Sequence, residues 1–366
     1  MPVARTFDSS TQSPRSCLAA VFHGAAAGCE LQQVDLPASL KVGEALVKVT
    51  CCTLCGSDWS TMDGHRQEPT PCILGHEITG VVQQLGPGEI LDLRGRPVRL
   101  GDRVVWSVIV ACQQCDYCVR DLPQKCRYLH KYGHARLAAD WRLSGGLAEY
   151  CHLLSKTQIV VVDSPVPDRV LAPASCATAT AAAALRTAGT ISGRRVLVVG
   201  AGLLGLTACA MARVHGATHI TLCDIVPQRI VPGKQFGADE CICTDQLAGD
   251  ARRLFDVILE MSGSVHALQT ALATADIGAQ LVLVGAVRPT PPVELYPEQM
   301  IRRLWSLHGV HNYRPHDLLA GVEFLEQHGN RFPFAEVIAA GGRLSDLPRT
   351  LQTTPAERPI RVAICP

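Results

Sequence analysis

Residues 194–224 read RRVLVVGAGLLGLTACAMARVHGATHITLCD, and this stretch carries the pattern from which the fold is predicted. An apolar run ends at Gly200, a helical run follows, and a second apolar run ends at Asp224. Gly200, Gly202 and Gly205 form a G-x-G-x-x-G pattern at the predicted strand-to-helix turn. The first glycine permits the turn, the second lets the backbone approach a pyrophosphate, and the third permits close helix packing. The stretch therefore predicts a βαβ unit that binds a dinucleotide.

The acidic residue that ends the second strand predicts which dinucleotide is bound. Asp224 stands about twenty residues after the glycines, where a carboxylate holds the ribose hydroxyls. A carboxylate there repels a 2′-phosphate, so NAD is expected rather than NADP. Arg229, a few residues later, could flank the adenosine side, which leaves NADP as an alternative.

The alternation of strands and helices extends beyond this unit. Residues 177–189 form an alanine-rich helical stretch, and residues 256–263 and 279–287 are apolar runs that each reach a glycine. This order predicts a parallel, doubly wound sheet. About the first 165 residues instead carry short β-type runs bounded by glycine or proline, which predicts a β-rich domain. A chain of 366 residues is too long for one ordinary core, so an α/β protein of two domains is expected.

Composition argues against several classes of function. Lys and Arg number 34 against 33 Asp and Glu, a net charge of +1, which disfavours a nucleic-acid or membrane-surface binder. No apolar run reaches the roughly 18–20 residues of a membrane span. Residues 1–16 lack the apolar core of a secretory signal, so a cytoplasmic location is expected, where thiols stay reduced. Cysteines scattered singly among the 17 are expected to pack as small hydrophobes.

One group of cysteines does not fit that description. Cys112, Cys115, Cys118 and Cys126 form the pattern C-x₂-C-x₂-C-x₇-C. Four thiolates at short spacing in a reducing compartment suit a closed, tetrahedral, structural Zn²⁺ site. An iron–sulfur cluster and four free thiols remain as alternatives.

A second set of metal-ligating residue types lies apart from this loop. Cys55 and His76, with Glu77 beside the histidine, are candidate ligands of a catalytic zinc ion. Such an ion needs three protein ligands and a vacant position. Cys176, just before the nucleotide-binding half, is a candidate for the third ligand, although a lone cysteine there would ordinarily be core packing.

Taken together, these motifs resemble the zinc-containing medium-chain alcohol dehydrogenases over nearly the whole chain. The matching segments are CGSD at 55–58, GHE at 75–77, the four-cysteine loop, GGLAEY at 145–150 and GAGLLG at 200–205. The resemblance implies a GroES-like zinc catalytic domain over residues 1–176, to which residues 313–366 return, and a Rossmann NAD-binding domain over residues 177–312. It further implies an active site between the domains, one catalytic and one structural zinc ion per chain, a small alcohol as substrate, and a homo-oligomer, either dimer or tetramer.

The resemblance also implies roles for residues around the catalytic metal. Cys176 takes the position of the third ligand beside Cys55 and His76. Ser57 is expected to accept the proton of the alcohol, and Asp58 to fix His76 through its other ring nitrogen. Glu77 is expected to lie close to the metal or to exchange onto it. The implied cofactor contacts are Gly200, Gly202, Leu203, Leu204, Gly205, Asp224, Arg229 and Thr180.

Two positions depart from the family pattern. The histidine that frequently ends the proton relay falls on Ser60, so the relay would end at Ser60, at water or at another side chain. Pro232 and Gly233 fall where relatives carry an unbroken helix, so that helix is expected to start late or to kink.

Four further stretches resemble the dehydrogenases associated with phosphonate catabolism. They are LPQKCRYLHKYGH at 122–134, WRLSGGLAEYC at 141–151, PASCATATAAAALR at 173–186 and GVHNY at 309–313. The implied substrate is a small hydroxyalkyl compound that bears, or derives from, a phosphonate, and burying such an anion without a cation costs several kcal/mol. The expected pocket residues are Trp59, Trp141, Arg136 and Arg66, with Lys131 and His134 next.

Other functions stay open at this point. A polyol or amino-alcohol dehydrogenase, similar to sorbitol or threonine dehydrogenase, would use the same chemistry on an uncharged or cationic substrate. A nucleotide sensor would not need the ligand set of Cys55, His76 and Cys176. A nucleic-acid binder built on the four-cysteine loop is disfavoured by the neutral net charge and by Asp116 and Asp121 in that loop.

Overall fold

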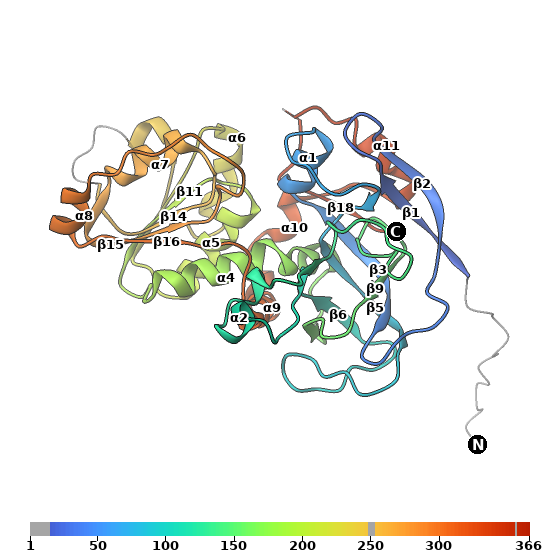
Figure 1. Cartoon of the computed structure of the whole chain (residues 1–366). Coiled ribbons are helices and arrows are strands. Elements are labelled where there is room, and N and C mark those ends of the chain that lie inside the picture. The colour runs from blue at the N-terminus through green and yellow to red at the C-terminus, as the bar shows by residue number, and fades with distance from the viewer. Residues whose placement is uncertain (1–14, 248–252, 356) are drawn as a thin grey trace, which may run out of the picture.

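The computed structural model describes residues 15–247, 253–355 and 357–366. Figure 1 shows two parts: an α/β part around a parallel sheet, and a β-rich part that holds strands from both ends of the chain. The predicted fold class is therefore confirmed.

Six parallel strands form the sheet of the α/β part, in the order β13-β12-β11-β14-β15-β16. Their bounds are β11 Arg195–Val199, β12 His219–Asp224, β13 Glu240–Cys243, β14 Phe255–Glu260, β15 Ala275–Leu283 and β16 Ser306–Gly309. When the six strands are numbered in the order in which they follow one another along the chain, their order across the sheet is 3-2-1-4-5-6, which is the Rossmann order. Ligands of such sheets bind beyond the carboxyl ends of the strands where the order reverses, here between β11 and β14.

The glycine-rich turn joins β11 to helix α5 (Leu203–Val214). Gly200 has a φ of +105°, a backbone angle that residues with a side chain rarely adopt. A Cβ on Gly205 would lie 1.8 Å from the Gly200 carbonyl oxygen, so this position must also be glycine. The remaining helices of this part are α6 Pro227–Ile230, α7 Val265–Leu272 and α8 Pro297–Arg303. After α6 the chain tightens into a 3₁₀ turn, η3 (Val231–Lys234), where Pro232 and Gly233 predicted an interrupted helix.

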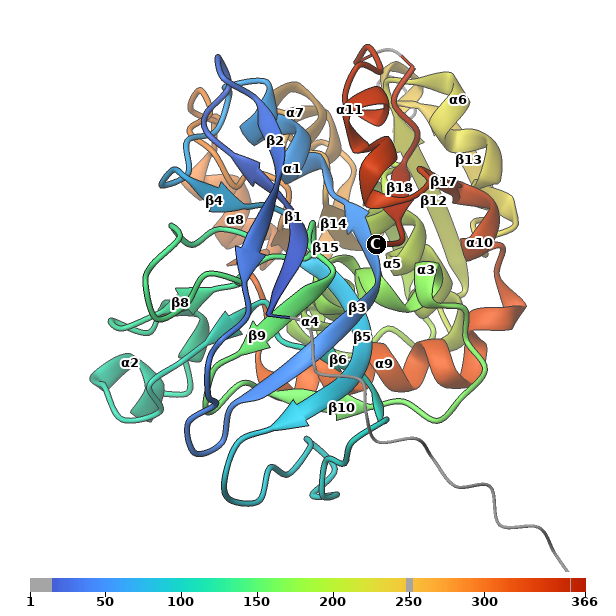
Figure 2. The same cartoon turned by 90° about the vertical axis from the view of Figure 1, so that its right-hand side faces the viewer.

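The β-rich part is built on a seven-stranded sheet in which β10-β6-β5-β3-β18-β17 form the path and β9 also pairs with β3. These strands are β3 Ala45–Leu54, β5 Glu77–Leu85, β6 Arg103–Trp106, β9 Tyr150–Leu153, β10 Ile159–Val161, β17 Ile338–Ala340 and β18 Arg361–Ile364. The strand β18, near the C-terminus, pairs antiparallel with β3, which comes early in the chain (Figure 2).

Two smaller sheets complete this part. One has the order β2-β1-β4, with β1 Ser16–Phe22, β2 Cys29–Asp35 and β4 Cys72–Ile73. The other pairs β7 (Ile109–Val110) with β8 (His130–Lys131). The short helices here are α1 Gly56–Met62, α2 Asp116–Val119, α3 Asp168–Leu171, α10 Phe334–Val337 and α11 Leu347–Thr350.

Two longer helices, α4 (Ala177–Ala188) and α9 (Pro315–His328), lie where the chain passes between the two parts (Figure 1). The two helices pack closely at Gly321 of α9, where an added Cβ would lie only 3.1 Å from the Ala179 amide nitrogen. Arg186 of α4 donates two hydrogen bonds to the buried Asp317 carboxylate of α9, at 2.6 and 3.0 Å. Within the described ranges, no helix is long and apolar enough to cross a membrane.

Candidate active site and metal centres

The loop that contains the four predicted structural ligands brings their sulfur atoms together. The ligand atoms of Cys112, Cys115, Cys118 and Cys126 all lie within 4.8 Å of one another. Three of the sulfur–sulfur distances are 3.6, 3.9 and 4.0 Å. Four thiolates around one zinc ion at about 2.3 Å would be separated by about 3.8 Å. This spacing fits a single tetrahedral ion better than a multi-iron cluster, whose cysteines bind different irons.

Backbone amides prepare these sulfurs to carry negative charge. The amide of Cys112 donates to the Cys126 sulfur at 3.2 Å, and that of Cys115 donates to the Cys112 sulfur at 3.3 Å. Hydrogen bonds from the backbone of Arg127 and Cys118 lower the pKa of Cys115 to about 6. The thiolate is the form that binds a metal, so the donor set fits the ion that the sequence predicts.

The four-cysteine lobe, residues 112–126, also contacts a distant segment of the chain. Lys125 Nζ lies 2.9 Å from His311 Nδ1. Asp121 forms an ion pair with Arg314 at 2.8 Å. Residues 311–314 are the segment through which the chain leaves β16 and enters α9, so the lobe is docked onto the crossing between the two parts.

The second predicted ligand set also lies together. The ligand atoms of Cys55, His76, Glu77 and Cys176 are within 4.8 Å of one another. Cys55 precedes α1, and Cys176 precedes α4. His76 directly precedes β5, and Glu77 is the first residue of that strand. The Cys176 thiol, the Arg361 guanidinium and His76 lower the pKa of Cys55 well below its usual range. Two sulfurs and one imidazole are the ligand chemistry of an open zinc site.

Asp58 orients two of these ligands. Its carboxylate accepts a hydrogen bond from the Cys55 amide at 2.8 Å and another from the Gly75 amide at 3.3 Å. The same carboxylate lies 3.3 Å from His76 Nδ1. Among the described residues, His76 Nδ1 makes no hydrogen bond, so Asp58 faces it at ion-pair distance only. With the carboxylate on the Nδ1 side of the ring, Nε2 is the atom expected to face a metal.

Arg361 is a site residue that the sequence reasoning missed. Its guanidinium donates to both oxygens of the fully buried Glu77, at 3.0 and 3.2 Å, and to the Cys55 sulfur at 3.4 Å. Thr53 Oγ1 donates to the same carboxylate at 2.6 Å. Burial raises the pKa of Glu77, and the charge of Arg361 opposes that shift. The available signal was the arginine in the otherwise apolar run IRVAI at residues 360–364.

The two serines proposed for proton transfer lie on α1. Ser57 and Ser60 are both half-buried. In the part of the chain that the structure describes, neither side-chain hydroxyl has a hydrogen bond, although the Ser57 carbonyl accepts one from Thr61. Ser57 lies two residues after Cys55 in the first turn of the helix.

The two tryptophans expected in the substrate pocket lie instead in the core of the β-rich part. The Trp141 ring packs against Tyr132 at 5.4 Å, and its Nε1 donates to the His152 carbonyl at 2.9 Å. Trp59 is 7% exposed and is covered by the Arg358 guanidinium, 4.2 Å from the ring centre. Apolar burial and cation–π packing account for both rings, so the structure gives no support for a pocket role.

The expected cationic residues have different positions. Arg136 is exposed, and its backbone bridges to Cys72. Arg66 lies 2.8 Å from the Glu68 carboxylate, which also lies 2.8 Å from His134 Nδ1. The His134 ring is 4.8 Å from the His76 ring. Arg66, Glu68 and His134 therefore form a chain that leads to a candidate zinc ligand, whereas Arg136 is not part of it.

The candidate cofactor residues surround the end of β11. Asp224 is buried, and its carboxylate accepts hydrogen bonds from the amides of Ala201 at 2.7 Å and Val226 at 2.9 Å. Leu203 is buried and Leu204 is half-buried at the start of α5. The other two candidates, Thr180 and Arg229, lie on α4, where Thr180 is half-buried, and on α6, where Arg229 is exposed.

Comparison with known proteins adds an independent line of argument. Residues 41–168 match the family model of the alcohol dehydrogenase GroES-like domain, and residues 204–327 match that of the zinc-binding dehydrogenases. An L-threonine 3-dehydrogenase from Streptomyces avermitilis is 30% identical over 266 residues, 69% of this chain and 72% of the relative. A 5-exo-hydroxycamphor dehydrogenase from Pseudomonas putida is 25% identical over 334 residues, 88% of this chain and 91% of the relative. The crystal structure of an alcohol dehydrogenase from Thermotoga maritima superposes with a TM-score of 0.88 at 24% identity, covering 96% of this chain and 99% of the other.

Proposed function

Because this chain belongs to the zinc-containing medium-chain alcohol dehydrogenase family, we propose that it oxidises a small alcohol at the site formed by Cys55, His76 and Cys176. It is a zinc-dependent oxidoreductase that uses a nicotinamide cofactor. In the reaction, the CH–OH carbon gives up a hydride to NAD⁺ and the hydroxyl gives up a proton, so the products are an aldehyde or ketone, NADH and H⁺. The observation that carries the proposal is the open ligand set beside a carboxylate that is already paired with Arg361.

Each residue around the metal site has its own proposed role. Zn²⁺ held by Cys55, His76 and Cys176 would supply Lewis acidity that favours loss of the hydroxyl proton near neutral pH. Asp58 fixes the orientation of His76 and of the Cys55 backbone. Ser57 is proposed to accept the proton of the alcohol and to pass it outward past Ser60 or through water. Glu77 would stay close to the metal, because moving onto it would require breaking two hydrogen bonds to Arg361.

The cofactor is proposed to be NAD rather than NADP. The support is the Asp224 carboxylate at the end of β12, which would repel a 2′-phosphate. The other proposed contacts are Gly200, Gly202, Gly205, Leu203, Leu204, Thr180 and Arg229. The exposed Arg229 is the feature that would favour NADP instead.

The proposed domain division places residues 1–176 and 313–366 in the catalytic domain and residues 177–312 in the NAD-binding domain. Its support is that β11 to β16 share one sheet, whereas β17 and β18 belong to the sheet of β3 and β5. The assembly is proposed to be a dimer or tetramer, which light scattering of the purified protein would test.

The proposed substrate is a hydroxyalkyl compound that bears, or derives from, a phosphonate. The support is the resemblance of residues 122–134, 141–151, 173–186 and 309–313 to phosphonate-associated dehydrogenases. The second candidate, an amino alcohol, is favoured by the similarity to L-threonine 3-dehydrogenase. An ammonium substrate would need an unpaired carboxylate near the metal, and Glu68 is already shared by Arg66 and His134.

The test is alcohol-dependent NADH formation by zinc-loaded protein, screened over hydroxy compounds with and without a phosphonate group. Activity with at least one alcohol is expected, and Cys176→Ser should lower kcat strongly because it removes a proposed metal ligand. A fully zinc-loaded protein that reduces NAD⁺ with none of these alcohols would overturn the proposed function.

A further inference from the structure

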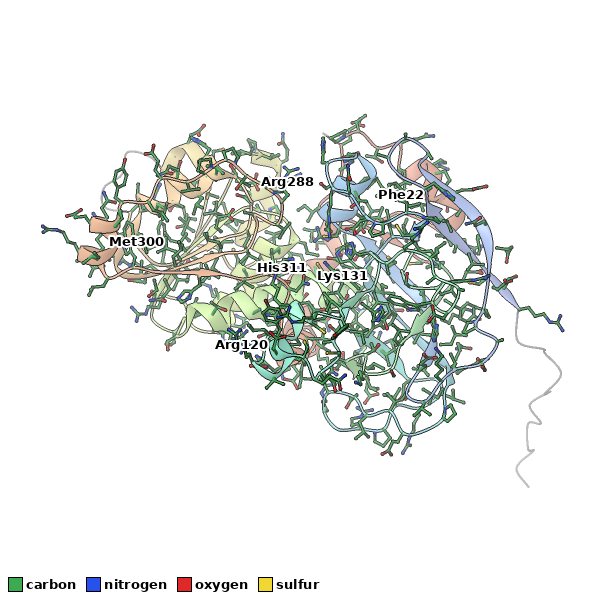
Figure 3. The ribbon with its side chains drawn as sticks, viewed as in Figure 1. Phe22, Arg120, Lys131, Arg288, Met300 and His311 are labelled. Carbon is green, nitrogen blue, oxygen red and sulfur yellow. The ribbon has the colours of Figure 1, made fainter. Side chains whose placement is uncertain are left out.

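Four basic side chains lie close to one another, and the proposed mechanism uses none of them. The group consists of Arg66, Lys125, Lys131 and His311, and is called the basic cluster below. Arg66 is linked to the candidate ligand His76 through Glu68 and His134. Its members come from three segments that are distant in sequence: the loop after α1, the region from the four-cysteine lobe to β8, and the segment after β16. Figure 3 shows Lys131 and His311 next to each other where the two parts of the molecule meet.

The position of Lys131 follows from its strand and the glycine after it. Lys131 ends β8, where it pairs with Ile109 of β7. Two residues later, Gly133 packs so closely that a Cβ there would lie 2.6 Å from the Gly75 carbonyl oxygen and 2.9 Å from His76 Cβ. Burial and the charge of Arg66 lower the pKa of Lys131, while Cys176 and Glu68 act in the opposite direction. Lys131 therefore lies within electrostatic reach of a proposed metal ligand.

Lys125 and His311 are the other two members of the cluster. Their side-chain nitrogens lie 2.9 Å apart. Partial burial and the positive charges of Lys125, Lys131 and Arg66 lower the pKa of His311 to about 4, so its ring is neutral at pH 7. A neutral Nδ1 can accept a hydrogen bond from the Lys125 ammonium. The four-cysteine lobe thus supplies one of the cations and holds it in position.

The charges of this cluster do not balance. Arg66, Lys125 and Lys131 contribute three positive charges, and the nearby Glu68 carboxylate is shared between Arg66 and His134. Across the described ranges, neither Lys125 nor Lys131 forms an ion pair with a carboxylate. Arg66 and Lys131 are half-buried, whereas Lys125 is exposed. Like charges at half-buried positions are unfavourable unless an anion joins them.

We propose that the basic cluster is a binding site for a tetrahedral dianionic group, a phosphonate or phosphate, on the alcohol that is oxidised at the neighbouring metal site. This inference rests on the proposed function and deepens it. It assigns Lys125 and His311, which the sequence did not suggest, and it leaves out Arg136. Arg66 offers a planar, forked donor and the lysines offer point charges, a combination suited to a group with three oxygens.

The two phosphates of the cofactor are not expected to occupy this cluster. The glycine turn between β11 and α5 is the place where the backbone can approach a pyrophosphate. A 2′-phosphate would lie against Asp224, at the end of β12. The substrate is therefore the anion that the cluster would receive.

The experiment compares matched substrates and matched variants of the zinc-loaded enzyme. The kcat/KM values are measured for 2-hydroxyethylphosphonate, a hydroxyalkyl phosphate ester, a hydroxy acid and plain 1-propanol. Lys131→Met is the test variant and Lys125→Met, at an exposed side chain, is the second in case the first does not fold. Lys48→Met, which removes the same charge from an exposed position on β3, is the control. Calorimetric titration with methylphosphonate, which has no hydroxyl to oxidise, measures binding without turnover.

The phosphonate or phosphate alcohol should exceed 1-propanol by at least about tenfold in kcat/KM, about 1.4 kcal/mol of transition-state binding. Lys131→Met or Lys125→Met should reduce that ratio and weaken methylphosphonate binding, whereas Lys48→Met should preserve both. The ratio of kcat/KM for 2-hydroxyethylphosphonate to that for the hydroxyalkyl phosphate ester shows which of the two anionic groups the cluster prefers. If the uncharged alcohol is the better substrate, or if methylphosphonate binds equally well to all variants, the anion site is wrong. If no alcohol reduces NAD⁺ but methylphosphonate binding still depends on Lys131 or Lys125, the proposed function fails and the anion site stands.

Discussion

Glu77 is a fully buried carboxylate that depends on a side chain from the other end of the chain. Arg361 neutralises its charge through two hydrogen bonds and also donates to the sulfur of Cys55. A buried carboxylate without such a partner is costly, because the protein interior solvates a charge poorly. A metal site that contains two thiolates therefore also needs this cation to limit its negative charge.

Arg361→Met should lower the free energy of unfolding by about 3 kcal/mol, since removing one partner of a buried pair typically costs 3–5 kcal/mol. Adding Glu77→Gln to this variant should restore part of the loss, because it removes the uncompensated charge. Arg142→Ala is the control, as its ion pair with Asp35 is exposed and should contribute less than about 1 kcal/mol. Chemical denaturation of the zinc-loaded proteins measures all three, and an Arg361→Met midpoint equal to that of the wild type would contradict the expectation.

The Asp224 carboxylate has a local role as well as its proposed cofactor role. It accepts the amide hydrogen bonds of Ala201 and Val226, which fix the glycine turn and the start of the loop after β12. Asp224→Ala would remove these anchors together with the charge. Asp224→Asn removes the charge and keeps one acceptor oxygen, so it is the cleaner test of cofactor choice.

Asp224→Asn should reduce the preference for NAD over NADP by about tenfold or more, because one close charge repulsion of 1.4 kcal/mol corresponds to that factor. The measurement is the ratio of kcat/KM for the two cofactors at one fixed alcohol concentration. Equal use of NAD and NADP by the wild type would show that Asp224 does not exclude the 2′-phosphate.

At the scale of helices and strands, local sequence pattern predicted much of the fold. The apolar run before Gly200 became β11, and the helical and apolar runs after it became α5 and β12. One of the predicted short β-type runs, EALVKVTCC at residues 44–52, became most of β3. The motifs Cys55, His76 and Cys176 also converged as the resemblance implied. The strand and helix predictions succeeded because periodicity is a property of neighbouring residues. The convergence of the three ligands came instead from the family resemblance, because these residues are far apart in the sequence.

The relations between distant segments could not be predicted in this way. Arg361 reaches Glu77 because β18 pairs with β3, and no local pattern states that pairing. Trp141 was expected in a pocket, but its indole NH is satisfied by the His152 carbonyl and its ring fills the core. Lys125 was overlooked because its partner, His311, is almost two hundred residues away along the chain. Burial and charge balance decide such contacts, and both require the folded arrangement.

The four-cysteine lobe is the element whose stability depends most directly on a metal. Its two helical pieces, α2 and η1 (Pro123–Lys125), are single turns without buried residues. Short helices of this kind are not stable alone, so we expect an ion held by the four sulfurs to stabilise the lobe.

Cys115→Ser should reduce the zinc content from about two ions per chain to about one, as expected for one closed and one open site. The Tm should fall by roughly 5–10 °C, because the lobe, its ion pair with Arg314 and its hydrogen bond with His311 would loosen. Metal analysis of protein purified without chelator and a thermal unfolding curve measure the two effects. A wild-type content of one zinc per chain, with the four cysteines free to react with a thiol reagent, would refute the structural zinc site.

At the scale of the whole molecule, the two parts are joined by two crossings, and one of them carries the candidate metal ligand Cys176. The first crossing contains Cys176 and α4, and the second contains Tyr313 and α9 (Figure 1). Ser175, beside Cys176, donates from its hydroxyl to the His76 carbonyl at 3.0 Å. Tyr313 connects the crossings, since its hydroxyl donates to the Ser175 carbonyl and accepts from the Val108 amide at 3.0 Å. The position of one metal ligand is therefore coupled to the way the two parts are held together.

Tyr313→Phe should test this coupling, because it removes one hydroxyl and leaves the ring in place. The Tyr313 side chain is 2% exposed, so the Ser175 carbonyl and the Val108 amide would lose a partner in a place that water does not reach. Each buried polar group left unpaired costs about 1–3 kcal/mol, so the free energy of unfolding should fall by about 2 kcal/mol or more.

The catalytic zinc should also be lost faster to a chelator, because Ser175 is tied to both Cys176 and His76, while the zinc of the four-cysteine lobe should leave at its wild-type rate. Tyr296→Phe is the matched control, as its hydroxyl is exposed and bonds only to the neighbouring Glu294 carboxylate at 3.1 Å. If Tyr313→Phe and Tyr296→Phe release the catalytic zinc at the same rate, the hydroxyl of Tyr313 holds the two parts together without positioning the metal ligands.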